Sequence, residues 1–376
     1  MKKNIGTIND LGKILINLSS IKFNYKILKN KVGKNCDVSA VLKADAYGLG
    51  AKKIGKVLEN LGCKIFFVAN ISEAIELRKN LKQCEILVLN GPSIFSLKGL
   101  GYFNKYRLIP VLNSLEDLES LIELKKKKSD FFLFSIALHF DTGMNRLGIK
   151  LKDLGKVRNL VIKNNLKIFS VMSHLSSSDE PKNLINSRQK LLFGKLVDNF
   201  PNTKLSIANS TAIFNLKNFN YSFIRSGGAL FGINPFEKKN PLQNVVSLLA
   251  KVIQLRNIRD ETIKTIGYNS FYRLNKPIKI GVLGVGYADG YPRRLSNVGY
   301  GIFKNKKLPI VGNISMDYMT VDLSNLKSEA IKVGDWVELI GENITIQEVA
   351  NLSETIEYEI LNNLGNRLKK KYIDSK

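Results

Sequence analysis

Short apolar runs alternate with amphipathic segments over the first 235 residues, and no other feature constrains the fold as strongly. The runs are rich in β-branched and aromatic residues, as buried parallel strands are. The stretches between them, such as SLEDLESLIELKKKK, carry apolar residues at helical spacing. About eight such strand–helix units in about 200 residues predict an α/β fold, a closed (β/α)8 barrel of the TIM type. An open, doubly wound sheet is the alternative. The runs are SAVLKA (39–44), IFFVAN (65–70), EILVLN (85–90), LIPVLN (108–113), FFLFSIALHFD (131–141), IFSVMSH (168–174), KLSIANS (204–210) and SFIRSG (222–227).

The pattern changes after Pro241. Short strand-like runs separated by Gly, Asn and Asp turns follow, and no long helix-period segment occurs until about residue 346. We therefore expect an N-terminal strand within residues 1–18, a barrel over residues 19–240 and a mostly β C-terminal domain over residues 241–376. The N-terminal run KILINL is expected to pair with the C-terminal domain, because the ends of a domain often lie close together.

The chain is strongly basic, with Lys+Arg 58 against Asp+Glu 32 and a formal net charge of +26. A nucleic-acid partner is one explanation of this charge. However, the basic residues are scattered, and the sequence has no nucleic-acid-binding motif and no zinc-ligand spacing. We therefore expect many solvated lysine-rich faces and no nucleic-acid partner, because net charge bears on solubility rather than on fold.

The cysteines and the apolar runs indicate the compartment. Cys36, Cys63 and Cys84 are odd in number and match no metal or disulfide framework. The segment MKKNIGTIND lacks the apolar core of a signal peptide. The longest apolar run, near FFLFSIAL, is too short to span a membrane. The sequence predicts a cytoplasmic protein without a metal and without a membrane partner.

Polar residues gather where the expected barrel strands end. In barrel enzymes the active site lies at the carboxyl ends of the strands. Any one histidine or asparagine there is more often structural, so it is the gathering that predicts a site. The residues are Lys43, Asn70, Asn90, Asn113, His139, Asp141, His174, Asn209, Ser210 and Arg225.

Lys43 and the stretch IRSGGALFG together predict a covalently bound cofactor. Gly227 and Gly228 follow the eighth strand, and Ser210 follows the seventh, where barrels commonly hold a phosphate through backbone N–H groups. A tight barrel corner is the alternative explanation of the two glycines. A lysine at an apolar strand end loses its proton more easily, which makes its amine nucleophilic. A lysine opposite a phosphate pocket suggests a Schiff base with a phosphorylated aldehyde, of which pyridoxal phosphate is the common case.

The motifs that carry these residues resemble those of the alanine racemase family. The lysine motif of that family is similar to VKANAYGHG, and this chain has LKADAYGLG. The resemblance implies a pyridoxal-phosphate barrel followed by a β domain, which interconverts L- and D-alanine and supplies D-alanine for peptidoglycan. It also implies a homodimer in which the second domain of the partner completes each active site. The further matches, in the family's order, are HFDTGMNRLG (139–148), SHLSSSDE (173–180), ANS (208–210), IRSGGALFG (224–232), GYNSF (267–271), GYADGYPRR (286–294) and GNISMDYMTVDL (312–323).

The resemblance implies a role for each matching residue. Lys43 would hold the cofactor and act as one catalytic base, and Tyr268 of the partner subunit would be the opposite base. Arg146, Met316 and Asp317 would form the substrate site. Asp179, Tyr287 and Arg293 would line the channel by which substrate enters. The cofactor-binding residues would be Lys43, Tyr47, His174, Asn209, Ser210, Arg225, Gly227 and Gly228.

The chemistry agrees with these roles. A racemase removes a proton from one face of Cα and returns one to the other face, so two bases are expected. Lysine and tyrosine both titrate near 10, and a neighbouring Arg146 would lower the pKa of Tyr268 by favouring the phenolate. Arg225, with a pKa above 12, should keep its proton, which leaves the pyridine ring neutral and a weaker electron sink. That favours proton exchange over transamination.

The chain departs from the family pattern at several positions. His139 replaces a lysine that many members carry as a carbamate, so we expect Arg146 to be neutralised by Asp141, water or a bound anion. Asn313 stands where an arginine of the substrate channel is common. None of the departures removes a proposed base. The others are Leu49 for histidine, Ser226 for proline, Ser315 for cysteine, and Asn366 where some members place a tyrosine near the phosphate.

Three other functions are alternatives to an alanine racemase. A broad-specificity or serine-type racemase differs only in the size of its side-chain pocket, which the sequence does not fix. A barrel-type decarboxylase should carry a glycine-rich phosphate motif and a C-terminal cysteine site, and neither is found. A non-catalytic pyridoxal-phosphate carrier would lack the second domain that bears Tyr268.

Overall fold

The computed structural model describes residues 11–91, 97–127, 135–234, 240–259, 265–270, 272–326, 330–365 and 367–374. Contacts divide these residues into two compact units. The first unit is Ile21–Gln243, and the second joins the N-terminal segment up to Ser20 with the residues from Asn244 onward. Each unit has its own core and is described by itself.

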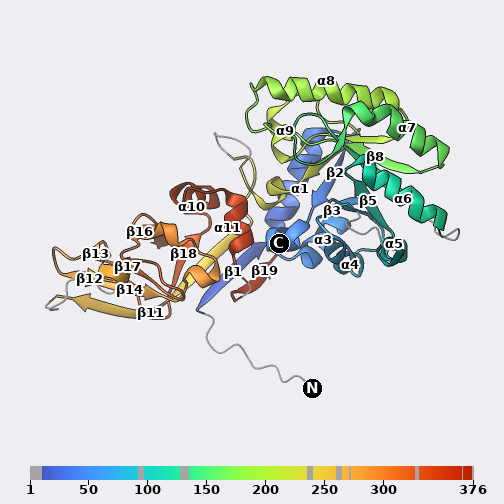
Figure 1. Ribbon diagram of the computed structural model, residues 1–376. Helices are drawn as coiled ribbons and strands as arrows, with labels where there is room; N and C mark the ends of the chain where they lie inside the picture. Colours follow the sequence, from blue (N-terminus) through green and yellow to red (C-terminus); the bar gives the residue numbers. More distant parts are fainter. Residues whose placement is uncertain are drawn as a thin grey trace, which may run out of the picture. The chain divides into compact units, whose positions relative to one another are not determined.

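The first unit is a parallel barrel surrounded by helices (Figure 1). Within the described residues, eight strands pair in the order β10-β2-β3-β4-β5-β6-β8-β9, and a parallel bridge between Asn209 and Arg225 joins the two ends. The predicted barrel is confirmed, and the open doubly wound sheet is wrong. Of the run FFLFSIALHFD, residues 131–134 lie outside the described residues. The strands are β2 (Asp37–Val41), β3 (Ile65–Val68), β4 (Glu85–Val88), β5 (Leu108–Leu112), β6 (Ile136–Asp141), β8 (Ile168–Met172), β9 (Lys204–Ser206) and β10 (Phe223–Ser226), and the short β7 (Ile149–Lys150) pairs with β6.

The barrel core consists of apolar side chains from successive strands. Phe67 of β3, Leu87 of β4, Val111 of β5 and Phe223 of β10 belong to one buried cluster. Burying a side chain of this size stabilises the fold by about 1.5–3 kcal/mol. Since these side chains fill the interior, the chemistry of the barrel has to lie at its rim.

Helices follow the barrel strands, and local sequence signals set where they begin. Asn70, for example, caps α4 by accepting a hydrogen bond from the N–H of Glu73 at 3.0 Å. Among the described residues, no helix is long and apolar enough to cross a membrane. The helices of this part of the chain are α1 (Leu18–Val32), α2 (Lys43–Tyr47), α3 (Ala51–Asn60), α4 (Ile71–Arg78), α5 (Leu97–Lys105), α6 (Leu115–Lys127), α7 (Leu154–Lys163), α8 (Leu184–Asn199) and α9 (Ser210–Asn215), with short 3-10 helices η1 (Leu151–Asp153) and η2 (Gly228–Phe231).

The second unit is mostly β, as the sequence predicts. In its described part, the main sheet has the order β16-β15-β18-β11-β1-β19, while β14 pairs with β11 and with β17. The N-terminal strand β1 runs antiparallel to β11 and parallel to β19. The elements are β1 (Gly12–Asn17), β11 (Val246–Ile258), β12 (Thr265–Ile266), η3 (Tyr268–Ser270), β13 (Tyr272–Arg273), β14 (Ile278–Leu283), η4 (Tyr287–Asp289), η5 (Arg293–Leu295), β15 (Tyr300–Phe303), β16 (Lys306–Pro309), β17 (Met319–Asp322), β18 (Trp336–Ile340), α10 (Ile346–Leu352), α11 (Glu357–Asn363) and β19 (Lys369–Ile373).

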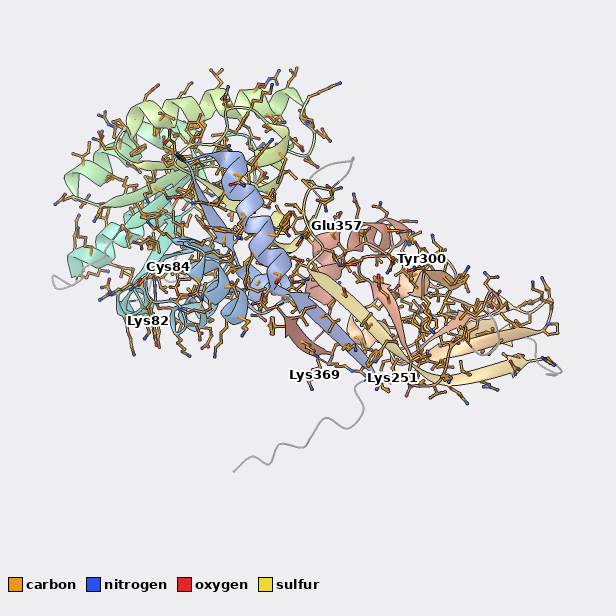
Figure 2. All side chains as sticks on the ribbon, turned by 180° about the vertical axis from the view of Figure 1, so that it is seen from behind. Lys82, Cys84, Lys251, Tyr300, Glu357 and Lys369 are labelled. Carbon is orange, nitrogen blue, oxygen red and sulfur yellow. The ribbon has the colours of Figure 1, made fainter. Side chains whose placement is uncertain are left out.

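Basic side chains occur on both units, as Lys82 of the first and Lys251 of the second illustrate (Figure 2). Two lysines of the second unit lie over one aromatic ring. The Nζ atoms of Lys13 and Lys251 are 3.8 Å and 4.9 Å from the centroid of a Trp336 ring. Desolvation, and after it the like charges of Lys371 and Lys251, lower the pKa of Lys13, so the positive charge costs some stability at this face.

Candidate active site

Lys43 follows β2 and opens a turn of left-handed helix. Four consecutive residues after it have φ between 52° and 57°, a region that costs an L-residue roughly 1–2 kcal/mol. Backbone hydrogen bonds close the turn: the N–H of Gly48 donates to Ala44 at 2.8 Å, and the N–H of Gly50 donates to Asp45 at 2.8 Å. Strain of this kind is tolerated where the surrounding structure fixes it, and it often marks a functional position. The four residues are Ala44, Asp45, Ala46 and Tyr47.

Glu73 holds this turn from α4, the helix that follows the neighbouring strand β3. Its Oε1 accepts a hydrogen bond from the N–H of Ala44 at 2.9 Å, and its Oε2 accepts one from the N–H of Ala69 at 2.7 Å. Glu73 is not among the residues expected from the sequence, because an acidic residue in the first turn of a helix such as α4 is ordinary.

The Lys43 side chain is exposed at the barrel rim, but the protein around it still displaces hydrating water. Desolvation lowers the pKa of Lys43, the positive charge of Arg146 lowers it further, and Glu73 opposes both effects. A larger fraction of unprotonated amine makes a better nucleophile. The structure therefore supports the lowered pKa expected for a lysine at this strand end.

Arg225 is buried at the end of β10, with 6% of its surface exposed. Its Nη1 donates to the carbonyl oxygen and the Oγ of Ser206 at 2.9 and 2.8 Å, and its Nη2 donates to the carbonyl of Ser173. Burial lowers the pKa of Arg225 to about 10, which is below the value above 12 expected from the sequence. The guanidinium still stays protonated at neutral pH. Among the described residues, its Nε–H has no hydrogen-bond acceptor.

His174 accepts a hydrogen bond from Arg225. The two nitrogens, Nδ1 of His174 and Nη2 of Arg225, are 3.1 Å apart. Arginine can only donate, so Nδ1 carries no proton and the imidazole is neutral. Burial, together with the charge of Arg225, holds the pKa of His174 well below its usual range, in agreement with this tautomer.

The backbone after β10 forms a cradle with Ser210 and Tyr47. The Oγ of Ser210 accepts hydrogen bonds from the N–H of Gly227 at 3.0 Å and of Ala229 at 3.3 Å. A Cβ atom on Gly227 would lie 2.3 Å from the Tyr47 hydroxyl oxygen, so only glycine fits. Gly228 is the first residue of η2, and its N–H therefore has no partner within that helix. These features fit an anion such as a phosphate group.

Asn209 positions this cradle through its backbone and cap. Its Oδ1 accepts hydrogen bonds from the N–H of Ala212 at 3.0 Å and from the hydroxyl of Ser178 at 2.8 Å, so it caps α9. Ser226 adds a second hydroxyl, whose Oγ is 3.4 Å from that of Ser210. A direct contact of Asn209 with a cofactor stays a prediction.

His139 lies in β6, where the family commonly has a lysine. Its Nδ1 is 2.7 Å from the Oδ1 of Asn113, whose amide nitrogen donates to the carbonyls of Leu89 and Val111. The amide oxygen therefore faces the ring, and Nδ1 carries the proton. Desolvation and the charge of Arg225 lower the pKa of His139 to about 4, so it is neutral at physiological pH.

Asp141 does not neutralise Arg146. Its carboxylate accepts hydrogen bonds from the backbone N–H groups of Gly143, Met144 and Asn145 at 2.8, 2.9 and 3.2 Å. Within the described part of the chain, Arg146 makes no ion pair and no hydrogen bond. Of the partners expected for Arg146, Asp141 is wrong, and water or a bound anion stays a prediction.

The expected site residues of the second unit share one surface of that unit. The side-chain nitrogen of Asn313 donates to the carbonyl of Tyr268 at 3.1 Å, and the N–H of Tyr287 donates to Ser315 at 3.0 Å. Tyr268 is 67% exposed and Met316 53% exposed, and Tyr287 is exposed as well. Large exposed side chains on connected loops are typical of a surface that meets a partner.

Arg367 connects the loop that carries Asp317 to the loop that carries Asp289, and it was not among the residues expected from the sequence. Its Nη2 donates to the Oδ1 of Asp317 at 2.7 Å, and its Nε is 3.5 Å from the Oδ1 of the buried Asp289. The other oxygen of Asp289 accepts from the N–H of Gly286 at 2.9 Å. Asn366, the neighbouring position of interest, lies outside the described residues.

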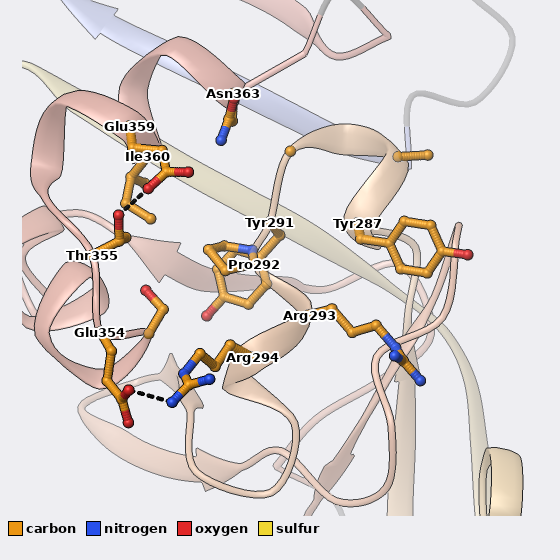
Figure 3. Close-up of a pocket in the computed structure, with 13 residues that line it drawn as sticks. Tyr287, Tyr291, Pro292, Arg293, Arg294, Glu354, Thr355, Glu359, Ile360 and Asn363 are labelled. Atoms are coloured by element: carbon orange, nitrogen blue, oxygen red, sulfur yellow. Dashed lines mark hydrogen bonds and ion pairs between the residues drawn. The ribbon is translucent and has the colours of Figure 1, made fainter.

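Tyr287 and Arg293 line a cavity of about 520 Å³ within the second unit (Figure 3). An ion pair between Arg294 and Glu354 lies at its edge. All residues that line it belong to the second unit. Asp179, the third residue expected in the substrate channel, lies exposed in a turn of the first unit before α8.

The first unit is a parallel barrel with a lysine of lowered pKa at one strand end and a glycine cradle that fits an anion after the last strand, and a β unit follows it. This combination is typical of enzymes that bind a phosphorylated aldehyde cofactor. Comparison with known proteins narrows this class. Residues 16–235 match the family described as the alanine racemase N-terminal domain, and residues 245–372 match the alanine racemase C-terminal domain. The chain therefore belongs to the alanine racemase family, whose members are pyridoxal-phosphate-dependent isomerases.

Individual relatives agree with this assignment. The alanine racemase of Rickettsia bellii is 39% identical over 90% of this chain and 82% of its own length. That of Brucella abortus is 35% identical over 96% of this chain and 93% of its own. The crystal structure of the Bartonella henselae alanine racemase with covalently bound pyridoxal phosphate has a TM-score of 0.89 at 37% identity, and covers 97% of this chain and 100% of that one.

Proposed function

We propose that this enzyme interconverts L-alanine and D-alanine with pyridoxal phosphate held at the barrel rim. The observation that carries the proposal is the pairing of Lys43, an amine with a lowered pKa, with a glycine cradle at the same barrel end. Its relatives bear the name alanine racemase over most of the chain.

The residues at the rim fit the cofactor. Lys43 would tether it, and the N–H groups of Gly227 and Gly228 with the hydroxyls of Ser210 and Tyr47 would hold its phosphate. When bound, pyridoxal phosphate supplies an electron sink that makes the α-proton of an amino acid more acidic. The close approach at Gly227 supports this fit, because a Cβ atom there would lie 2.3 Å from the Tyr47 hydroxyl oxygen and would displace that hydroxyl.

Two bases would move the proton. Lys43 acts on one face of the substrate Cα, and Tyr268 of the partner subunit acts on the other. The exposure of Tyr268, 67% in this chain alone, supports a side chain that works outside its own unit.

Arginine side chains would orient the reacting groups. Arg225 offers an Nε–H without a protein acceptor in the described structure, which suits a ring nitrogen, and its pKa of about 10 keeps the proton on the arginine. Arg146, a cation without a protein partner among the described residues, would attract the substrate carboxylate. Met316 and Asp317 would line the same substrate site from the partner's second unit.

The proposal includes a homodimer in the cytoplasm that supplies D-alanine for peptidoglycan. The exposed surface formed by Tyr268, Tyr287, Met316 and Tyr318 supports the dimer, because such side chains gain most when a partner covers them. Growth of a D-alanine-requiring bacterium that expresses this chain would test the physiological part.

A direct assay tests the chemistry. The purified protein is incubated with a panel of L-amino acids, and D-products are separated on a chiral column. We expect equal amounts of L- and D-alanine from either enantiomer and slower conversion of larger amino acids. Borohydride should bleach the yellow protein and fix the cofactor on the peptide that contains Lys43. A colourless protein, or a panel without D-alanine, contradicts the proposal.

A further inference from the structure

Glu73 is an acidic side chain that hydrogen-bonds to the backbone of the Lys43 turn from outside it. Its two carboxylate oxygens bind two different strand ends: Oε1 accepts from Ala44, directly after Lys43, and Oε2 accepts from Ala69, directly after β3. These strands are neighbours in the barrel, with Val41 of β2 paired to Phe67 of β3. The carboxylate therefore bridges the end of one strand to the residue that follows the lysine on the next.

The bridge acts on a backbone that would not keep its shape alone. Ala44 is the first of the four left-handed residues, and its N–H belongs to the peptide group that follows the Cα of Lys43. A hydrogen bond to this N–H fixes the orientation of that peptide group, and with it the direction of the Lys43 side chain. The other end of the bridge is rigid, because Glu73 lies in the first turn of α4 and its own N–H is held by Asn70 at 3.0 Å.

We propose that Glu73 is a positioning residue for Lys43: its carboxylate locks the left-handed turn that presents the amine at the barrel rim. This inference rests on the proposed role of Lys43 as the reactive amine. Bonds from a carboxylate to backbone N–H groups are charge-assisted and about twice as strong as neutral ones, so an amide replaces them poorly. A displacement of about 1 Å at a reacting group can cost about 100-fold in rate.

The charge of Glu73 has a second effect on the same amine. The charged or titratable groups that act on Lys43 are Arg146 from the loop after β6, Glu73 from α4 and His174 after β8, of which His174 is neutral. Desolvation and Arg146 lower the pKa of Lys43, and Glu73 raises it. Loss of the carboxylate should therefore move the titration of the Lys43 amine to lower pH, which a merely structural role would not do.

The test compares Glu73→Ala and Glu73→Gln with a matched control, Glu76→Gln. Glu76 lies on the same helix, is 71% exposed and, among the described residues, forms an ion pair only with Lys79, one turn away. We expect kcat with alanine to fall about 10- to 100-fold in Glu73→Ala and about 3- to 10-fold in Glu73→Gln, while KM changes less than about 3-fold. Glu76→Gln should match the wild type. Glutamine keeps the shape and one acceptor oxygen, so it guards against a variant that simply fails to fold.

Two further readouts do not depend on racemisation. Hydrogen–deuterium exchange of the peptide over residues 43–50 should speed up in Glu73→Ala and not in Glu76→Gln. In protein freed of pyridoxal phosphate, the rate at which an amine-selective reagent labels Lys43 is followed by peptide mass mapping across pH, and the profile should move to lower pH in both Glu73 variants.

The outcomes separate this inference from the proposed function. A wild-type protein without racemase activity overturns the function, while exchange and labelling still test the bridge. An active wild type, together with Glu73 variants whose kcat, exchange and labelling profile are unchanged, overturns the inference alone. Equal losses in Glu76→Gln and Glu73→Gln overturn it as well, because the effect would then come from the helix surface.

Discussion

At Gly227 the backbone passes so close to Tyr47 that an added Cβ atom would lie 2.3 Å from its hydroxyl oxygen and 3.1 Å from its Cζ. Gly227→Ala must therefore push the Tyr47 ring or its own peptide out of place, and the ring is held by Phe231 at 5.1 Å between centroids. We expect the variant to lose pyridoxal phosphate on dialysis at least about 10-fold faster than the wild type, since displaced phosphate donors hold an anion poorly. Absorbance of the retained cofactor measures this.

Gly194 provides the control for that substitution. It lies within α8, and a Cβ atom there would meet nothing within 4 Å. Gly194→Ala should keep the cofactor and raise the free energy of unfolding by up to about 1 kcal/mol, because alanine favours a helix interior. Equal retention in Gly227→Ala and Gly194→Ala would mean that the cradle does not hold the phosphate.

Tyr268 gives a prediction about the two faces of the substrate. L- and D-alanine are equally stable, so kcat/KM must stay equal in the two directions for any variant. The loss of one base therefore has to be detected by another measurement, the exchange of the α-hydrogen of each enantiomer. In Tyr268→Phe, racemisation should fall at least about 100-fold, because the second proton has no donor. Lys43 remains, so one enantiomer alone should still exchange its α-hydrogen with D2O. Nuclear magnetic resonance of each enantiomer in D2O checks this, and equal exchange of both would contradict the two-base scheme.

His139 makes stability depend on pH. Its pKa falls from 6.5 to about 4 on folding, so between these values the unfolded chain binds the proton and the folded chain does not. The free energy of unfolding should therefore decrease as the pH drops through this window, by at most about 1.4 kcal/mol per pH unit from this residue. His139→Asn should flatten the slope, as urea unfolding at several pH values would show. Parallel slopes for wild type and variant would assign the acid sensitivity to other groups.

At the scale of elements, Arg367 joins the loop at Gly286 to the loop at Asp317 in the second unit. Arg367→Ala would leave the buried carboxylate of Asp289 without its cation and free the loop that carries Met316. We expect KM for alanine to rise about 3- to 10-fold with a smaller change in kcat, because the loop that we propose binds substrate is loosened while both proposed bases remain. Arg367→Lys should recover part of the loss. A fall in kcat at constant KM would place Arg367 in the chemical step instead.

Glu73 and Arg367, which were not expected from the sequence, show which parts of a fold local sequence patterns cannot predict. The barrel strands and their polar ends were predictable, because a continuous apolar run and a helical period are local patterns. The left-handed sense of the turn after Lys43 was not, because Ala44 and Asp45 carry no local signal for it. Its partner Glu73 lies 29 residues from Ala44, and Arg367 lies 50 residues from Asp317. Contacts of that separation are set by the folded sheet and not by neighbouring residues.

At the scale of the whole molecule, the proposed bases lie in different units, Lys43 in the barrel and Tyr268 in the β unit. If each site takes its lysine from one chain and its tyrosine from the other, two different inactive variants should complement each other. Lys43→Ala and Tyr268→Ala are purified separately, then mixed and exchanged by mild denaturant and dilution. Half of the dimers are then hybrids, and each hybrid has one site with both bases.

The expected activity of that mixture follows from counting sites. One site in two is intact in half of the dimers, so about one quarter of the wild-type activity should return, and either variant alone should stay below about 1%. Native mass spectrometry of the mixture, in which the hybrid dimer has a mass of its own, measures whether subunits mix under these conditions. If they mix and the two variants together remain inactive, each site takes both bases from one chain, and the shared dimer site is wrong. Full recovery is impossible in this scheme, because every hybrid also contains one site that lacks both bases.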